Sequence, residues 1–254
     1  MQALIVYAHP EPHSFNAAMK HVAVETLTAQ GWRVEVSDLY AQDFKAAADG
    51  RDFVQRADAD YLKYAAEQTN AAGLDHGFAP DLAAEIAKLE AVDLLILQFP
   101  MWWFGFPAIL KGWVDRVFAV GRIYGGEIGM FSKGRFRGRR AMLAFTTGGA
   151  PETYGPAGLY GDADVILWPL QNGILNCVGF DVLPPFMAAA PSKVGDAGRV
   201  GILDAWATRL RSLDGAEPLF FHPLDDFDSD AAWTLRQGVA GRTIGQSARR
   251  ESDG

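Results

Sequence analysis

The sequence predicts an α/β protein built on a doubly wound parallel sheet of five strands, with helices on both faces. Five short apolar segments of strand length alternate with helical segments along the chain, which is the pattern of repeated βαβ units. The segment at 92–99 is almost continuously apolar, as is typical of a strand buried on both faces of a parallel sheet.

The elements follow one another in a regular order. The strands are predicted at 3–8, 32–38, 92–99, 140–145 and 180–187, and the helices at 14–30, 80–90, 108–120, 164–177 and 195–211. Ser14 is a suitable N-cap for the first helix, and Gly31 is a suitable residue to end it. The last helix is expected to pack through one apolar face, formed by Val200, Leu203, Trp206 and Leu210.

The chain is expected to form one sheet domain over residues 1–212, enlarged by an irregular insertion at about 40–80. Long irregular insertions are usually functional or interfacial. Residues 213–254 are expected to form a C-terminal extension, in which the apolar segment 218–223 packs against another part of the protein. The residues after about Gly241 are expected to be mobile.

Composition excludes several classes of protein. The chain has 254 residues and a net charge of −8, and this acidic balance disfavours a nucleic-acid partner. The only cysteine, Cys177, cannot form an internal disulfide. No apolar run approaches the roughly 20 residues of a membrane-spanning helix, and the N-terminus lacks the pattern of a secretory signal. We therefore expect a cytoplasmic protein without a membrane span.

Three loops follow predicted strands and are expected to meet at the carboxyl edge of the sheet, where open α/β sheets bind ligands. They cover residues 9–16, 100–106 and 146–161. The first loop leads into a helix N-terminus, whose backbone N–H groups can bind phosphate, although it has neither a P-loop nor a GxGxxG motif. An ordinary capped helix explains this loop equally well.

The second loop places four aromatic residues directly after a central strand: Trp102, Trp103, Phe104 and Phe106. Together they favour a flat heteroaromatic cofactor, whereas each one alone could belong to the core or to a dimer interface.

The third loop begins with Thr146 and Thr147, followed by two glycines that allow a ligand to approach the backbone closely. Tyr154 and Tyr160 lie further along it. Their phenols could donate a hydrogen bond or a proton to a reacting oxygen, or they could simply pack at the edge of the loop.

Other kinds of active site find no support. None of the five histidines occurs in an HExxH motif or beside a cysteine, so no metal site is predicted. Cys177 lies in an apolar segment, where a buried and unreactive thiol is expected. The GxSxG motif of α/β-hydrolases is absent.

Seven short motifs occur in register between about residues 3 and 206. They are SFN at 14–16, DLY at 38–40, QFP at 98–100, WFG at 103–105, PAILKGW at 107–113, TTGG at 146–149 and VILWP at 165–169. Together they resemble the NAD(P)H:quinone oxidoreductase family, the DT-diaphorase type of flavodoxin-like flavoprotein. The resemblance implies the sheet order 2-1-3-4-5 and a homodimer with FAD at its interface. It also implies ping-pong, two-electron reduction of a quinone by NAD(P)H, with hydride passing through flavin N5.

The resemblance further implies roles for individual residues. Those expected to hold the flavin are His9, Ser14, Phe15, Asn16, Lys63, Pro100, Met101, Trp102, Trp103, Phe104, Thr146, Thr147, Gly148, Gly149, Tyr154 and Arg199. Those expected to contact the substrate are Tyr124, Trp103, Phe104 and Tyr160. Tyr154 and Tyr160 form the expected catalytic pair, in which Tyr154 stabilises charge during hydride transfer.

Three residues depart from the family pattern. Tyr160 stands where the best-known members have a histidine, and a phenol, with a reference pKa of about 10 against about 6.5 for imidazole, carries protons poorly near neutrality. Lys63 replaces an amide that reaches FAD across the interface, and its ammonium could pair with a phosphate. Trp102 is bulkier than the usual residue and is expected to narrow the substrate cleft.

Two other functions stay open. One is an FMN-dependent reductase of nitroaromatic or azo compounds, since many flavodoxin-like reductases use the smaller flavin. The other is a regulatory subunit that senses redox state in an ion-transport system. The match at Arg199 and the length of the chain favour FAD. The sequence does not distinguish NADH from NADPH as the donor.

Overall fold

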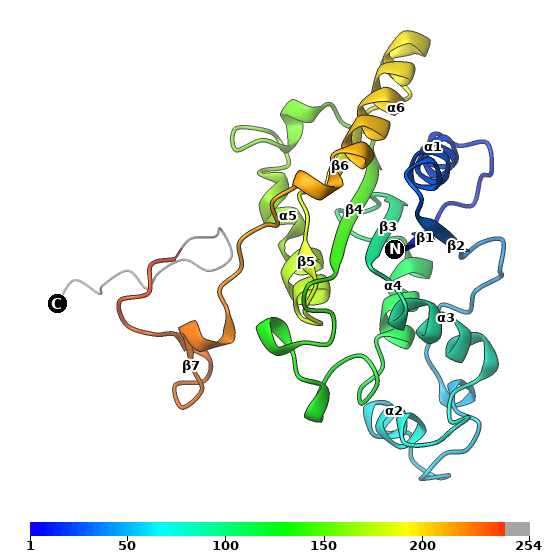
Figure 1. Ribbon diagram of the computed structural model, residues 1–254, viewed down its shortest axis with the longest axis vertical. Helices are drawn as coiled ribbons and strands as arrows, with labels where there is room; N and C mark the ends of the chain where they lie inside the picture. Colours follow the sequence, from blue (N-terminus) through cyan, green and yellow to red (C-terminus); the bar gives the residue numbers. More distant parts are fainter. Residues whose placement is uncertain (242–254) are drawn as a thin grey trace.

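The computed structural model describes residues 1–241 and contains the predicted parallel sheet (Figure 1). Its strands are β1 (Gln2–Tyr7), β2 (Arg33–Asp38), β3 (Leu94–Pro100), β4 (Arg140–Thr147), β5 (Asp181–Val182) and β6 (Phe186–Ala189). The order is β2-β1-β3-β4-β5, with β6 also paired to β4, and every pairing in this sheet is parallel. The predicted order is therefore confirmed, with the fifth strand divided into two short pieces.

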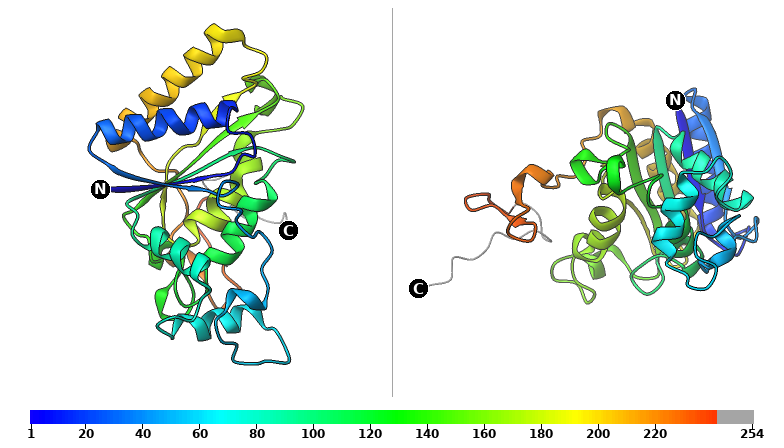
Figure 2. Two further views of the ribbon diagram at one scale, coloured as in Figure 1. Left: turned by 90° about the vertical axis from the view of Figure 1, so that its right-hand side faces the viewer. Right: turned by 90° about the horizontal axis from the view of Figure 1, so that it is seen from below.

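Helices cover both faces of the sheet, as predicted. They are α1 (Phe15–Ala29), α2 (Tyr64–Ala72), α3 (Pro80–Glu90), α4 (Ala108–Val117), α5 (Ala163–Leu170) and α6 (Gly195–Arg211). Figures 1 and 2 show α1 and α6 on one face, and α3, α4 and α5 on the other. The remaining short elements are η1 (Gly50–Asp52), η2 (Gly126–Ile128), η3 (Phe131–Lys133), η4 (Pro151–Tyr154), η5 (Gln171–Asn176), η6 (Leu213–Gly215), η7 (Leu224–Asp226), β7 (Phe227–Asp228) and β8 (Thr234–Leu235).

Two hydrophobic cores lie on the two faces of the sheet. Alternate residues of β3 point to opposite faces, so that Leu95 and Leu97 join the core under α3 and α4, while Leu94 and Ile96 join the core under α1 and α6. Every residue of β3 is buried. This double burial explains why the strand has no polar and apolar alternation in the sequence.

Three helix predictions need correction. The segment predicted as one helix at 164–177 is α5 followed by the π-helical turn η5, because Pro169 has no N–H to continue the ordinary pattern. Helix α4 ends at Val117 and not at residue 120. Val200 does not belong to a packed face: its side chain is 58% exposed, because the N-terminal half of α6 projects beyond the sheet (Figure 1).

The insertion at 40–80 is fixed to the main body by a buried ion pair. The guanidinium of Arg116 in α4 donates to both carboxylate oxygens of Asp52, at 3.1 and 2.9 Å, and to the backbone oxygen of Lys45 at 2.7 Å. Asp52 also accepts from the Tyr64 hydroxyl at 2.7 Å and from the Lys45 ammonium at 2.9 Å. This network attaches both ends of the irregular stretch before α2 to α4.

The C-terminal extension packs through its first segment, as predicted. The backbone N–H of Leu219 donates to Val182 at 2.8 Å, and the ring of Phe221 lies 5.6 Å from that of Trp168. The hairpin of β7 and β8 then projects away from the body (Figure 2). The expectation of mobility after about Gly241 concerns residues outside the described part of the chain. No helix within residues 1–241 is long and apolar enough to cross a bilayer.

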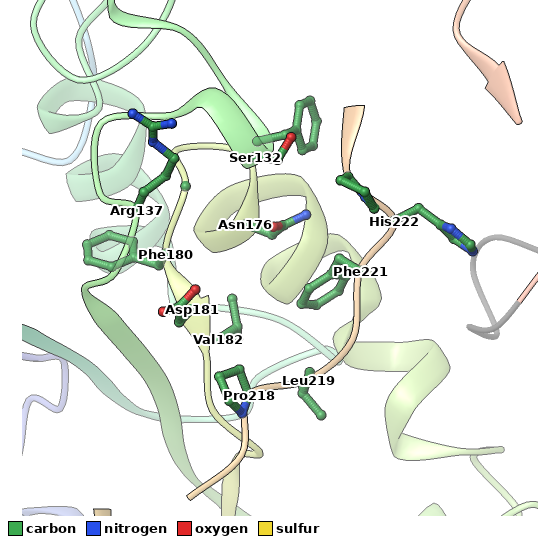
Figure 3. A pocket seen from close by; sticks show the side chains of 13 residues that line it. Ser132, Arg137, Asn176, Phe180, Asp181, Val182, Pro218, Leu219, Phe221 and His222 are labelled. Atoms are coloured by element: carbon green, nitrogen blue, oxygen red, sulfur yellow. The ribbon is translucent and has the colours of Figure 1, made fainter. Parts of the chain in front are cut away.

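The extension also closes a cavity of about 350 Å³ against β5, shown in Figure 3. Its walls include Arg137, Asn176, Asp181 and Phe221. Because Asp181 pairs with Arg140 at the beginning of β4, this cavity lies at the amino edge of the sheet. It is therefore separate from the three loops at the carboxyl edge.

Candidate functional site

The structure brings the three loops together at the carboxyl edge of the sheet. The side-chain amide of Asn16, in the first turn of α1, donates to Oγ1 of Thr146 at 2.8 Å. The backbone oxygen of Thr146 accepts from the N–H of Met101 at 2.9 Å. Thr146, at the end of β4, therefore connects the first loop to the second.

The first loop presents a capped helix N-terminus. The Ser14 hydroxyl accepts from the N–H of Ala17 at 3.1 Å and lies 3.3 Å from the Tyr7 hydroxyl. Nδ1 of His9 accepts from the N–H of Glu11 at 3.0 Å, and burial lowers the pKa of this imidazole. His9 is therefore neutral near pH 7, and its remaining proton lies on Nε2, where it can be donated to an anion.

The second loop is a tight turn with an unusual backbone. Trp102 and Gly105 exchange backbone hydrogen bonds at 3.2 and 3.1 Å, and the two residues between them, Trp103 and Phe104, have φ values of +49° and +62°. Such turns normally contain Asn or Gly, because a side chain is strained in the left-handed region. The turn nevertheless carries two large rings, and the side chain of Trp103 is 96% exposed.

The third loop places two tyrosines against this turn. The ring of Tyr160 lies 5.3 Å from the ring of Phe104 and 5.3 Å from that of Tyr154. A Cβ on Gly149 would lie 3.1 Å from the Tyr154 ring and 2.7 Å from the Thr153 hydroxyl, so a side chain there would displace the loop. A Cβ on Gly148 would meet nothing within 4 Å. The backbone at Gly148 is therefore open to a ligand.

Two of the expected site residues lie elsewhere in the chain. Lys63 precedes α2 and is exposed, and α2 lies at the opposite end of the molecule from the projecting half of α6 (Figure 1). Tyr124 follows α4 and lines a cavity of about 290 Å³ together with Cys177 and Ile174. Burial, with a smaller contribution from Cys177, raises the pKa of Tyr124. A single chain does not bring these residues to the three loops.

Arg199 occupies the projecting half of α6. Its guanidinium pairs with Asp196 one turn earlier and donates to the backbone oxygen of Pro191 at 3.4 Å. The pair with Asp196 is exposed and the bond to Pro191 is long, so the side chain can exchange them for a ligand at little cost.

One residue of this edge was missed by the sequence analysis. Gln98, near the end of β3, is completely buried, and its side-chain amide donates to the backbone oxygen of Asn16 at 2.5 Å. The available signal was a polar residue within a continuously apolar strand. Burying an amide costs free energy unless the amide is hydrogen-bonded, so such a residue indicates a specific partner.

Cys177 is half-buried, and burial raises the pKa of its thiol. Its reactivity stays a prediction. Among residues 1–241 there is no group of three or more His, Cys, Asp or Glu side chains that could hold a metal ion.

Comparisons with known proteins agree with this architecture. Residues 1–210 match the model of a family described as having a flavodoxin-like fold. NAD(P)H dehydrogenase (quinone) 1 of Rattus norvegicus is 43% identical over 241 residues, which cover 94% of this chain and 87% of that protein.

Two solved structures are also similar. A Klebsiella pneumoniae protein provisionally described as a quinone reductase has a TM-score of 0.90 and 38% identity, covering 98% of this chain and 100% of that one. The general stress protein 14 of Treponema denticola, solved in complex with FMN, has a TM-score of 0.59 and 25% identity, covering 85% of this chain and 99% of that one.

Proposed function

Because this chain belongs to the quinone reductase family of flavodoxin-like proteins, we propose that it reduces quinones with NAD(P)H by means of a bound flavin. The observation that carries this proposal is at the carboxyl edge of the sheet, where Phe104 of the strained aromatic turn contacts Tyr160, which in turn contacts Tyr154. Flat rings, free backbone and phenolic hydroxyls at one place suit a planar redox cofactor and a planar substrate.

The residues at this edge fit a flavin. Among the described residues, no acceptor engages the backbone N–H of Trp103 or Phe104, so both can donate to the polar rim of a flavin ring. The open backbone at Gly148 leaves room for that ring. The N-terminus of α1 and the neutral His9 suit the diphosphate of FAD. The buried Oδ1 of Asn16 has no partner within the described chain and can accept from a hydroxyl.

In this proposal the site residues fall into two groups, those that hold the flavin and those that contact the substrate. The flavin-holding set is the one expected from the sequence: His9, Ser14, Phe15, Asn16, Lys63, Pro100, Met101, Trp102, Trp103, Phe104, Thr146, Thr147, Gly148, Gly149, Tyr154 and Arg199. Tyr124, Trp103, Phe104 and Tyr160 contact the substrate.

A bound flavin supplies a ring that accepts hydride from NAD(P)H and passes it to a quinone. The exposed Trp103 ring and Phe104 hold the nicotinamide or quinone flat and exclude water from it. The rings of Tyr154 and Tyr160 contact each other, and in this proposal their hydroxyls donate to an oxygen that gains negative charge. The donors are fixed before the reaction because the two rings pack on each other and on Gly149.

The protein is proposed to act as a homodimer. Lys63 precedes α2, and Tyr124 lines a cavity with Ile174 and Cys177, so in this proposal both residues serve the site of a second copy. Exposed apolar side chains on the insertion, Val54 and Tyr61, and the exposed Trp103 ring provide surface for such an interface. Sedimentation of the purified protein should give twice the mass of the chain.

A cytoplasmic location, favoured by the single cysteine, is also part of this proposal.

The decisive experiment is to denature the purified protein and determine the mass and absorbance spectrum of the flavin that is released. We expect FAD, close to one per chain. Release of FMN would support the smaller cofactor instead, and a protein that takes up neither flavin would overturn the proposal. NADH oxidation measured with and without menadione then separates a quinone reductase from a protein that only senses redox state.

A further inference from the structure

Gln98 connects a central strand to the first turn of α1. Its Nε2 donates to the backbone oxygen of Asn16 at 2.5 Å, and the Asn16 side chain in turn donates to Thr146 at 2.8 Å. Gln98 has no exposed surface, and Asn16 is also buried. The two hydrogen bonds therefore hold the beginning of α1 between β3 and β4, directly at the carboxyl edge.

The hydrogen bond from Gln98 contributes little to stability, unlike the bond between Asn16 and Thr146. Oε1 of Gln98 has no hydrogen-bond partner within the described residues, so half of a buried amide is unsatisfied. The Asn16 oxygen is in the first turn of α1, where it can also accept from the helical N–H four residues later, so it does not depend on Gln98. An apolar side chain of the same length would fill the same space without an unsatisfied atom.

We propose that Gln98 is a positioning residue for the flavin site, which rests on the proposed function. Its hydrogen bond sets the place of Asn16 and therefore the direction in which the N–H groups at the start of α1 point. Gln98 itself is too deeply buried to touch the cofactor. Its effect passes through Asn16 and through the helix N-terminus that would hold the phosphates.

The test is the variant Gln98→Met, because methionine keeps the unbranched shape and removes both polar atoms. Flavin affinity is measured by titrating the flavin-free protein with FAD and following flavin fluorescence. We expect the Kd to rise about tenfold, the effect of losing one hydrogen bond. The melting temperature of the flavin-free protein should stay the same or rise. Hydrogen exchange should become faster at the backbone amides of the first turn of α1.

The matched control is Gln171→Met. Gln171 in η5 is also buried, and its Nε2 also has no partner within the described chain, but it lies beyond the C-terminal end of α5. The control should keep the wild-type Kd for FAD. It corrects for the general effect of removing a buried amide that has an unpartnered polar atom.

Two results would overturn the proposal. The first is a Gln98→Met protein with the wild-type Kd and wild-type exchange in α1. The second is a Kd that rises only together with a lower melting temperature, which would show that Gln98 is needed for folding. A wild-type protein that takes up no flavin would instead overturn the proposed function, while the exchange measurement would still report whether Gln98 positions α1.

Discussion

The side-chain amide of Asn16 donates a hydrogen bond of 2.8 Å to Oγ1 of Thr146, although the two residues are 130 positions apart in the chain. Asn16 is the second residue of α1 and Thr146 is near the end of β4, so this bond ties the N-terminus of α1 to the glycine-bearing loop. Both groups are buried, which makes the bond sensitive to small changes at either residue.

Replacing Thr146 by valine should lower the free energy of unfolding by about 1–3 kcal/mol, because the buried amide of Asn16 then has no acceptor. FAD binding should weaken as well. Urea unfolding and flavin titration measure the two effects. The control is Thr146→Ser, which keeps the hydroxyl and should restore most of both. Equal losses in the valine and serine variants would contradict the assigned hydrogen bond.

The two neighbouring glycines of the third loop should respond differently to alanine. Gly149→Ala should lower the melting temperature, because its Cβ would come within 2.7 Å of the Thr153 hydroxyl and 3.1 Å of the Tyr154 ring. Gly148→Ala should leave the flavin-free protein equally stable, because nothing lies within 4 Å, and should weaken FAD binding. Scanning calorimetry with and without FAD distinguishes the two. Unchanged FAD affinity in Gly148→Ala would show that the ring lies elsewhere.

The strained turn predicts a trade between stability and activity. Trp103→Gly should raise the free energy of unfolding by about 1 kcal/mol, because it relieves a positive φ and removes a side chain that is almost fully exposed. Quinone reduction should fall at the same time. Trp102→Gly is the control: Trp102 is outside the positive-φ pair, so glycine there should destabilise the protein. Loss of stability in both variants would mean that the Trp103 backbone carries no strain.

The buried ion pair between Asp52 of the insertion and Arg116 of α4 predicts that the protein loses stability in acid. Burial opposes ionisation of Asp52, but hydrogen bonds from Arg116, Tyr64 and Lys45 outweigh it and lower its pKa. A carboxyl whose pKa is lowered by folding stabilises the protein above its ordinary pKa near 4, and this contribution disappears as pH falls through the lowered value. Asp52→Asn should therefore show a weaker dependence of the unfolding free energy on pH below 5 than the wild type.

Removing Arg116, the cation of the same ion pair, should strongly destabilise the folded protein. Arg116→Met leaves the Asp52 carboxylate buried without its main partner, which should lower the free energy of unfolding by about 3–5 kcal/mol at pH 7. Arg51→Met is the control, because the Arg51 pair with Asp49 is exposed to solvent and should leave the unfolding midpoint unchanged. Similar midpoints for both variants would show that the buried pair does not hold the insertion.

The Tyr160 position should control how the reaction depends on pH. Histidine titrates between pH 5 and 8, so Tyr160→His adds a titrating group beside Phe104 and Tyr154. We expect the rate of flavin reduction by NADH to gain a new inflection in this range, measured by stopped-flow absorbance. Superimposable pH profiles for the variant and the wild type would contradict a role of this residue in handling protons.

Much of the fold could be predicted because it depends on local patterns. Strand β3 was found from its continuous apolar run and α1 from its Ser14 cap, and both are present within a residue or two of the expected bounds. Val200 was assigned to a buried face wrongly, because its apolar character says nothing of how far α6 projects beyond the sheet. The π-helical turn after Pro169 depends on where the displaced backbone groups find partners, which no local pattern records.

The site was only partly predictable, because its position follows from a general rule for parallel sheets but its individual contacts do not. The rule that ligands bind at the carboxyl ends of parallel strands located the three loops, and the structure brings Asn16, Met101 and Thr146 into contact there. A polar residue within the apolar strand signals that Gln98 is special, but its partner is a backbone oxygen, which any residue at position 16 would provide, so the contact itself could not be predicted. The strain at Trp103 and Phe104 is likewise hidden, since aromatic residues rarely adopt it.

The division of the fifth strand into β5 and β6 affects whether another protein chain can add a strand to this edge of the sheet. Leu183, Pro184 and Pro185 separate β5 from β6, and neither proline has an N–H to offer to a further strand. The N–H of Leu219 already engages the backbone oxygen of Val182 in β5, so a foreign strand approaching this edge would find at most the four residues of β6 as a ladder. The break and the bound extension therefore protect this edge against edge-to-edge aggregation, a hazard of any open sheet.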